Sequence, residues 1–211
     1  MRSMRPSVLI GVVFLLSARQ SLAGLPTVAT CHCPARITLV GFTAGVADGF
    51  GTFTLDVRDQ GNNPLYGASV VIDFSGCADI AICADQLDPG ATVNCAAKTT
   101  RKFTDVSGAV SFIVLGGSNG AGGVHAPLHG ARVFANGTLL ATPTAAALDL
   151  DGSSGVGIND LSVWLGDFGA TSPRGRADFD GDDSVGINDL SVWLSAFGLQ
   201  GSTQSCVTRC P

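Results

Sequence analysis

Oxygen-bearing side chains recur at the same spacing in two short stretches of the 211-residue chain. In the first, Asp149, Asp151 and Ser153 stand at positions one, three and five, Gly155 offers its carbonyl at position seven, and Asp160 stands at position twelve. Calcium takes six to eight oxygen ligands, which a flexible loop supplies best from alternating positions and a final carboxylate. The second stretch has the same pattern, and its ligands are Asp178, Asp180, Asp182, Ser184 and Asp189. The spacing predicts two Ca²⁺ ions, one in each loop.

The distribution of acidic residues supports this interpretation. All 17 acidic residues are aspartates, and nine of them fall between Asp149 and Asp189. The alternative is that aspartate and glycine here only form turns and cap helices. Because the whole spacing is duplicated, the calcium interpretation is favoured.

The loops belong to a direct repeat. Residues 149–169 and 178–198 are identical at 15 of 21 positions. After each loop, apolar residues recur at i, i+3, i+4 and i+7, which is typical of one face of a helix. We expect each copy to be a loop followed by a helix that buries Leu161, Trp164, Leu165 and Phe168 in the first copy, and Leu190, Trp193, Leu194 and Phe197 in the second.

Paired calcium loop-helix segments without an entering helix resemble type I dockerins, and the resemblance covers residues 149–198. It departs from the family at the sixth loop position, where Ser154 and Asp183 replace the usual glycine. The resemblance implies binding to a cohesin module on a scaffold or cell-surface protein, and association with polysaccharide-degrading assemblies.

The opposite face of each helix is the predicted docking surface. If the apolar stripe is buried, the partner-facing residues are Asn159, Ser162 and Val163 in one copy and Asn188, Ser191 and Val192 in the other. The two sets are identical, which predicts a twofold docking surface. The alternative is that these are ordinary solvated helix positions.

The preceding region, residues 37–148, has the period-two pattern of β-strands, for example at Phe53, Leu55 and Val57. Asn136-Gly137 predicts a type I′ hairpin. The runs at residues 57–70 and 104–112 resemble the immunoglobulin-like domains of bacterial surface proteins. We therefore expect a mixed fold: an N-terminal all-β immunoglobulin-like sandwich followed by a small α-helical dockerin-like unit with two EF-hand-like calcium loops.

The ends of the chain complete the predicted organisation. Residues 1–23 have the basic start, short apolar run and Ser-Leu-Ala ending of a signal peptide, which predicts a secreted protein without a membrane span. Loss of Arg2, Arg5 and Arg19 with this leader leaves 9 of the 12 basic residues against 17 acidic ones, so the net charge falls from -5 to -8. That charge argues against a nucleic-acid partner. Cysteine-containing segments are expected at residues 24–36 and 199–211.

Seven cysteines in an exported chain predict disulfides. We expect one local bridge, between Cys77 and either Cys83 or Cys95. The tail cysteines, Cys206 and Cys210, are expected to pair with the N-terminal cysteines, Cys31 and Cys33, or with each other.

Other chemistry is weakly supported, and we expect no catalysis. Residues 116–120 match a nucleophile-elbow pattern, but the glycines that follow do not predict the required helix. Cysteine and histidine at residues 31–33, with His125 and His129, could suggest zinc. Pro127 prevents the two histidines from sharing a helical face, however, and exported cysteines prefer disulfides. Three functions remain: docking to a cohesin-type partner, a structural or adhesive role in which calcium serves only stability, and binding or cleavage of polysaccharide.

Overall fold

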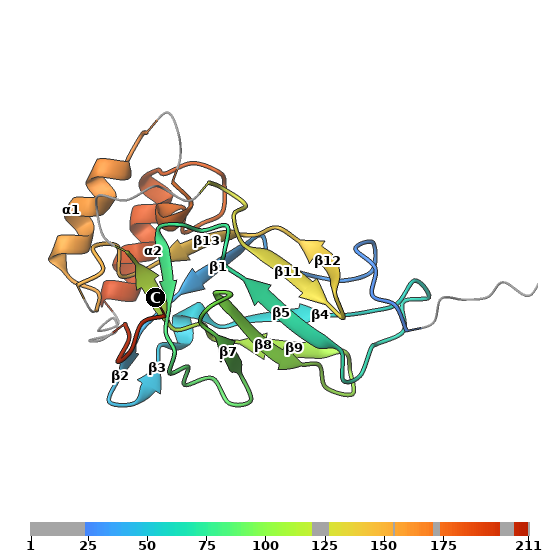
Figure 1. Cartoon of the computed structure of the whole chain (residues 1–211). Helices are drawn as coiled ribbons and strands as arrows, with labels where there is room; N and C mark the ends of the chain where they lie inside the picture. The colour runs from blue at the N-terminus through green and yellow to red at the C-terminus, as the bar shows by residue number, and fades with distance from the viewer. Residues whose placement is uncertain (1–23, 120–126, 154, 171–173, 199–204, 211) are drawn as a thin grey trace, which may run out of the picture.

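The computed structural model describes residues 24–119, 127–153, 155–170, 174–198 and 205–210. The predicted signal peptide lies outside these residues. The chain is mostly β, and two short helices, α1 (Ile158–Asp167) and α2 (Ile187–Gly198), lie at one end of the molecule (Figure 1). Neither helix, nor any other in the described part of the chain, is long and apolar enough to cross a membrane.

The largest sheet has five antiparallel strands in the order β12-β11-β5-β8-β7. Its strands are β5 (Ser69–Asp73), β7 (Thr92–Asn94), β8 (Thr99–Phe103), β11 (Arg132–Ala135) and β12 (Thr138–Ala141). Strand β5 buries alternate residues, Val70 and Ile72, as the period-two pattern predicts. The turn between β11 and β12 has positive φ at Asn136 (46°) and at Gly137 (82°), so the predicted type I′ hairpin is confirmed.

The remaining strands form four pairs. Strand β4 (Phe53–Asp56) pairs antiparallel with β9 (Ala109–Phe112), β6 (Ile80–Ile82) with β10 (Gly116–Ser118), and β2 (Phe42–Thr43) with β3 (Val46–Ala47). The fourth pair is parallel and joins the first strand, β1 (Arg36–Leu39), to the last, β13 (Thr144–Ala147). Two short 3-10 helices are η1 (Gly49–Gly51) and η2 (Gly175–Ala177).

Buried apolar residues form two clusters. The first lies among the strands and includes Ile37, Val70 and Phe112. The second joins strand-region residues to both helices, because Val40, Leu115, Ala146 and Leu148 pack in the same cluster as Trp164 and Trp193. The helices are therefore built onto the β part of the molecule.

The fold class that we predicted is wrong. In the described part of the chain there is no N-terminal immunoglobulin-like sandwich followed by a separate helical unit; the molecule is mostly β, with little helix. Two helices of 10 and 12 residues bury too little apolar surface between themselves, and they use the β part to complete their core.

Both expectations about disulfides are also wrong. The bridges are Cys83–Cys206 and Cys95–Cys210, and Cys31, Cys33 and Cys77 are free thiols. The C-terminal tail runs back beside β6, where the amide of Cys210 donates to the carbonyl of Ile82 at 2.9 Å. The tail cysteines therefore meet partners more than 110 positions earlier in the chain.

Candidate metal centre

Each predicted loop lies between a buried connection and a helix. Loop one, residues 149–160, starts two residues after β13 and ends in the first turn of α1. Loop two, residues 178–189, starts directly after η2 and ends in the first turn of α2. Both predicted helices are confirmed, and both place the aspartate of position twelve in their first turn.

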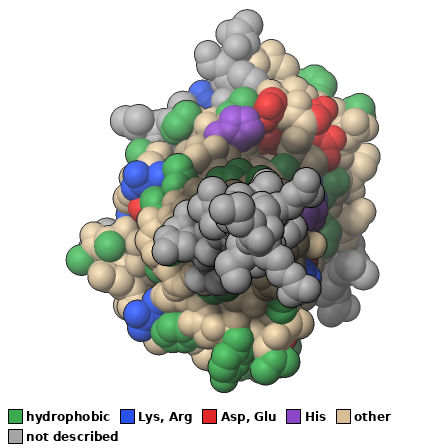
Figure 2. All heavy atoms as spheres, turned by 90° about the vertical axis from the view of Figure 1, so that its right-hand side faces the viewer, with side chains coloured by type: hydrophobic (Ala, Val, Ile, Leu, Met, Phe, Trp, Pro, Cys, Tyr) green, Lys and Arg blue, Asp and Glu red, His purple; other side chains and the backbone are tan. Residues whose placement is uncertain are grey.

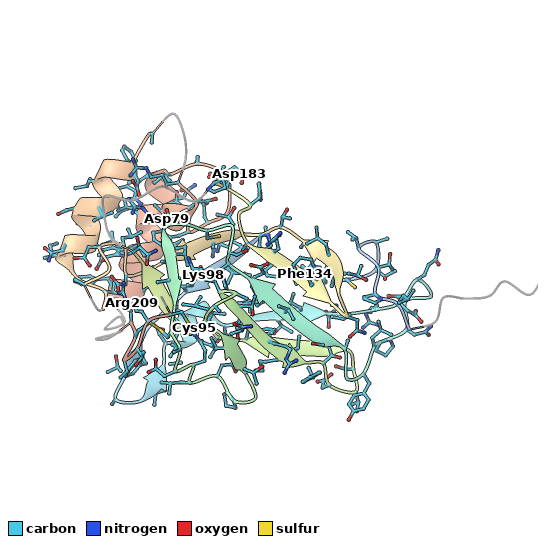
Figure 3. The ribbon with its side chains drawn as sticks, in the orientation of Figure 1. Asp79, Cys95, Lys98, Phe134, Asp183 and Arg209 are labelled. Atoms are coloured by element: carbon cyan, nitrogen blue, oxygen red, sulfur yellow. A yellow bond between two sulfur atoms is a disulfide. The ribbon has the colours of Figure 1, made fainter. Side chains whose placement is uncertain are left out.

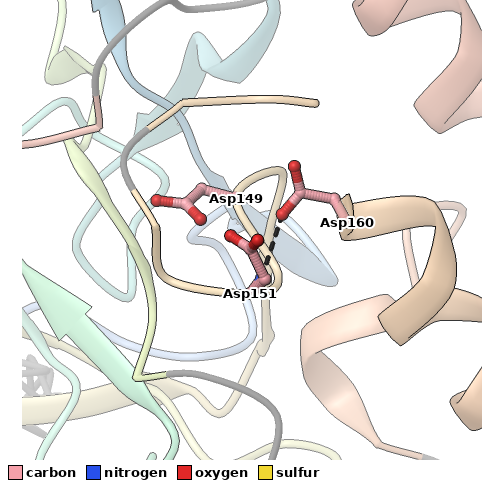
Figure 4. A group of neighbouring side chains, drawn as sticks. All are labelled: Asp149, Asp151 and Asp160. Carbon is pink, nitrogen blue, oxygen red and sulfur yellow. Dashed lines mark hydrogen bonds between the residues drawn. The ribbon is translucent and has the colours of Figure 1, made fainter. Parts of the chain in front are cut away.

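In loop one, the carboxylate of the aspartate at position twelve accepts hydrogen bonds from three backbone amides of the loop. Asp160 Oδ1 accepts hydrogen bonds from the amides of Leu150 (2.6 Å) and Asp151 (2.9 Å), and its Oδ2 accepts from the amide of Gly157 (2.6 Å). Figure 4 shows Asp149, Asp151 and Asp160 around the turn of the loop, and a dashed line marks the bond to Asp151.

Loop two has the same contacts at the same positions. Asp189 Oδ1 accepts from the amides of Phe179 (2.6 Å) and Asp180 (3.0 Å), and its Oδ2 accepts from the amide of Gly186 (2.7 Å). The sequence repeat is therefore also a repeat of loop geometry.

Carboxylate oxygens gather in both loops. One oxygen from each of Asp149, Asp151 and Asp160 lies within 4.8 Å of the others, and the same holds for Asp178, Asp180 and Asp182. Among the described residues, these are the groups of three or more histidine, cysteine or acidic side chains that could hold a metal.

Burial makes these carboxylates hard to ionise without a cation. Desolvation, reinforced by neighbouring carboxylates, raises the pKa of Asp160 to about 6 and that of Asp178 to about 6. Desolvation also raises the pKa of Asp149, although the side-chain hydrogen bond with Ser205 and the charge of Arg209 lower it in part. A divalent cation would offset both the desolvation and the repulsion.

One buried carboxylate oxygen in loop two indicates that these residues suit a cation. Asp178 is fully buried, and its Oδ2 has no hydrogen-bond partner among the described residues. Leaving a buried carboxylate oxygen without a partner costs free energy. All the donors in this group are oxygens, which suit Ca²⁺. The residues of loop two therefore fit calcium.

The other predicted ligands lie along the loops. Ser153 is exposed, and its amide donates to Asp151 Oδ1 at 2.8 Å; the amide of Ser184 donates to Asp182 Oδ1 at 2.9 Å. Gly155 is buried with a φ of 107°. At the sixth position Asp183 has a φ of 67°, while Ser154 lies outside the described residues.

The helix faces differ in part from the predicted ones. Asn159, Ser162, Asn188 and Ser191 are exposed as expected, whereas Val163 and Val192 are partly buried against the second core cluster. The prediction that the whole apolar stripe is buried is wrong, since only the tryptophans are fully enclosed. The exposed apolar side chains are Ile158, Leu165, Phe168, Ile187, Leu194 and Phe197.

Two groups beside the loops were not predicted. Asp167, at the end of α1, is fully buried and binds the guanidinium groups of Arg174 and Arg176. The second copy has Ala196 at this position, and that difference between copies was the available signal. In the tail, Arg209 Nη2 lies 3.1 Å from Asp149 Oδ2. Its position depends on the disulfides, and no local pattern indicated it.

A pocket of about 310 Å³ borders loop two. It is lined by Pro34, Ala35, Arg36, Thr38, Phe50, Gly51, Thr52, Phe53 and Asp180. Figure 2 shows acidic side chains gathered in one region of the surface, close to a histidine. His129 Nε2 lies 3.2 Å from Asp183 Oδ1 at the edge of loop two.

No protein-family model, curated protein or solved structure matches this chain.

Proposed function

We propose that this chain is an exported calcium-binding protein whose two loop-helix repeats dock it to a cohesin-type protein partner. The observation that carries the calcium part is the buried Asp178 Oδ2, which lies in a group of three carboxylates and has no partner among the described residues. The resemblance of the repeats to type I dockerins supports the choice of partner. The two disulfides are consistent with an extracellular location.

The exposed face of the helices supports docking. Ile158, Leu165 and Phe168 of the first copy are 67%, 60% and 50% exposed. The same residue types are exposed at the same positions of the second copy, as Ile187, Leu194 and Phe197. Large exposed apolar side chains that recur in this way are typical of a surface that binds another protein. Calcium acts on this surface indirectly, because the aspartate of position twelve belongs to the first turn of each helix.

Binding to a recombinant type I cohesin, measured by surface plasmon resonance with CaCl₂ and with EDTA, tests this function. We expect binding that EDTA abolishes and that Leu165→Asp combined with Leu194→Asp also abolishes. The matched control is Val106→Asp, because Val106 is 79% exposed and lies in a turn of the β part. Calcium binding without cohesin binding would support a structural or adhesive role instead.

The pocket beside loop two supports a second candidate, binding of an acidic polysaccharide. Phe50 and Phe53 offer apolar surface, and Arg36 Nη1 is buried without a hydrogen-bond partner among the described residues. A guanidinium suits a sugar carboxylate, which can accept two parallel hydrogen bonds. Titration with oligogalacturonate tests this candidate: Arg36→Met should abolish binding, and a neutral galactose oligomer should not bind.

A further inference from the structure

Asp149 and Asp178 hold the first position of their loops, yet their second carboxylate oxygens have different surroundings. Both side chains are buried, with 2% and 0% exposed. In each, Oδ1 accepts the amide of the glycine three residues later, at 2.8 Å from Gly152 and 2.7 Å from Gly181. Asp178 Oδ2 has no partner among the described residues, whereas Asp149 Oδ2 lies 3.1 Å from Arg209 Nη2. The oxygen that loop two leaves available is bound to a cation in loop one.

The tail holds this guanidinium in place. Arg209 Nη1 donates to the carbonyl of Ser118 at 3.0 Å, and Nη2 also lies 3.2 Å from Ser205 Oγ. Cys206 and Cys210, on either side of Arg209 in the sequence, form disulfides with Cys83 and Cys95, which directly follow β6 and β7. Figure 3 shows Arg209 at the end of the molecule that carries the helices. Because several contacts fix the guanidinium, it loses little further conformational entropy in binding Asp149.

Strand β10 packs against the same carboxylate of Asp149. A Cβ added to Gly117 would lie 2.9 Å from Asp149 Oδ2, so the side chain rests directly against the backbone of this strand. The amide of Ser118 donates to the backbone carbonyl of Asp149 at 2.7 Å. Asp149 Oδ2 is therefore held between β10 and the tail.

We infer that Arg209 is an internal cation that competes with Ca²⁺ for Asp149, so that the disulfide-bonded chain binds calcium tightly in loop two and weakly in loop one. The inference rests on the proposed calcium function. A calcium ion in loop one must displace the guanidinium from Asp149 or share the carboxylate with a nearby positive charge, and both reduce affinity. In loop two, no cationic side chain among the described residues bonds to Asp178 Oδ2, so this oxygen gains its first cation when calcium binds. His129 pairs with Asp183, which holds the sixth position and is not a predicted ligand.

The smaller number of carboxylate ligands also lowers the calcium affinity of loop one, since it has Ser153 where loop two has Asp182. A variant must therefore separate the two causes. The full oxidised chain carrying Asp180→Ala with Asp182→Ala keeps two of the four carboxylates of loop two, one fewer than loop one has, so calorimetric titration with CaCl₂ can follow loop one. Adding Arg209→Gln to this background leaves the carboxylates of loop one unchanged. We expect it to tighten loop one by roughly tenfold or more, the effect of losing one charge-assisted hydrogen bond.

The matched control is Arg132→Gln, which removes an arginine that pairs with Asp73 away from both loops. It should leave both calcium affinities unchanged. Thermal stability provides a second readout. Arg209→Gln should lower the melting temperature in EDTA, where Asp149 loses its cation, and lower it less in saturating CaCl₂, where calcium replaces the guanidinium.

Unchanged affinity of loop one, with equal destabilisation in EDTA and in CaCl₂, would show that Arg209 only fastens the tail and would overturn the inference. If Arg209→Gln does not fold, Arg209→Lys keeps the charge but loses the fork of two donors, and we expect it to tighten loop one by a smaller factor; no change would overturn the inference as well. Failure of the original chain to bind calcium in either loop would instead overturn the proposed function.

Discussion

The indole Nε1 of Trp193 donates a hydrogen bond to the backbone carbonyl of Leu148 across 3.2 Å. This contact ties α2 to the segment that leaves β13 and enters loop one. Trp164, the equivalent residue of the first copy, is just as buried, but its Nε1 has no partner among the described residues. Two identical side chains at the same repeat position therefore differ in a single hydrogen bond.

This difference predicts unequal costs for one substitution. Trp193→Phe leaves the Leu148 carbonyl unpaired, whereas Trp164→Phe removes a donor that was unpaired already. Each tryptophan also contacts a phenylalanine four residues later, so the loss of packing is similar. We expect Trp193→Phe to lower the free energy of unfolding by about 1 kcal/mol more than Trp164→Phe. Urea unfolding in saturating CaCl₂ measures both, and equal losses would contradict the argument.

Removal of calcium should destabilise the molecule as a whole. The helices share a core with Val40, Leu115 and Ala146, so they cannot unfold without exposing strand residues. Calcium at 100 times its dissociation constant contributes about 2.7 kcal/mol. The two tryptophans of the chain, Trp164 and Trp193, both lie in the helices, so fluorescence follows the helical end, while far-ultraviolet circular dichroism follows the secondary structure of the whole chain. EDTA should lower one common melting transition, and two separate transitions would contradict this expectation.

Local sequence signals predicted the local structure well. Alternation around Leu55 identified β4, and Asn136-Gly137 identified the hairpin. Direct repetition located both loops and both helices. These features depend on residues close together in the chain, where spacing alone determines which side chains share a face.

Long-range relationships could not be predicted in this way. The parallel pairing of Ile37 with Ala145 depends on a crossover of more than a hundred residues. Because the helices pack on strands, the surface they bury is set by the β part, and Leu165 stays 60% exposed although its spacing matches a buried stripe. The contact between Arg209 and Asp149 depends on disulfide pairing, which sequence does not specify.

The disulfides should contribute strongly to stability. In the chain-entropy model, a bridge that closes a loop of 123 residues, as Cys83–Cys206 does, stabilises the fold by up to about 5 kcal/mol. Its loss costs less while Cys95–Cys210 still joins the same two segments. Cys83→Ser combined with Cys206→Ser should nevertheless lower the melting temperature. Cys31→Ser is the control, because Cys31 is a free thiol and serine keeps a hydrogen-bonding atom near the Arg58 amide. Non-reducing peptide mapping that shows other pairs would contradict this assignment.

Acidity should act in opposite directions with and without calcium. Burial raises the folded-state pKa of Asp160 to about 6 and that of Asp178 to about 6, above the ordinary value of 3.8. Between pH 3.8 and about pH 6 the folded chain binds more protons than the unfolded chain. Stability in EDTA should therefore rise as the pH falls from 7 towards 5. Protons also compete with calcium for the same carboxylates, so calcium affinity should fall over this range.

Melting curves between pH 5 and pH 8, recorded in EDTA and in CaCl₂, test both effects. The stabilisation by calcium should shrink steadily as the pH falls through 6. Asp178→Asn provides the matched variant, because it makes one of the two groups permanently neutral at nearly constant volume. In EDTA it should flatten the pH dependence and stabilise the chain at pH 7, where the charge on the buried Asp178 is least favourable. If stability in EDTA instead falls as the pH is lowered from 7 to 5, with or without the substitution, burial does not raise the pKa values of these carboxylates in the folded chain.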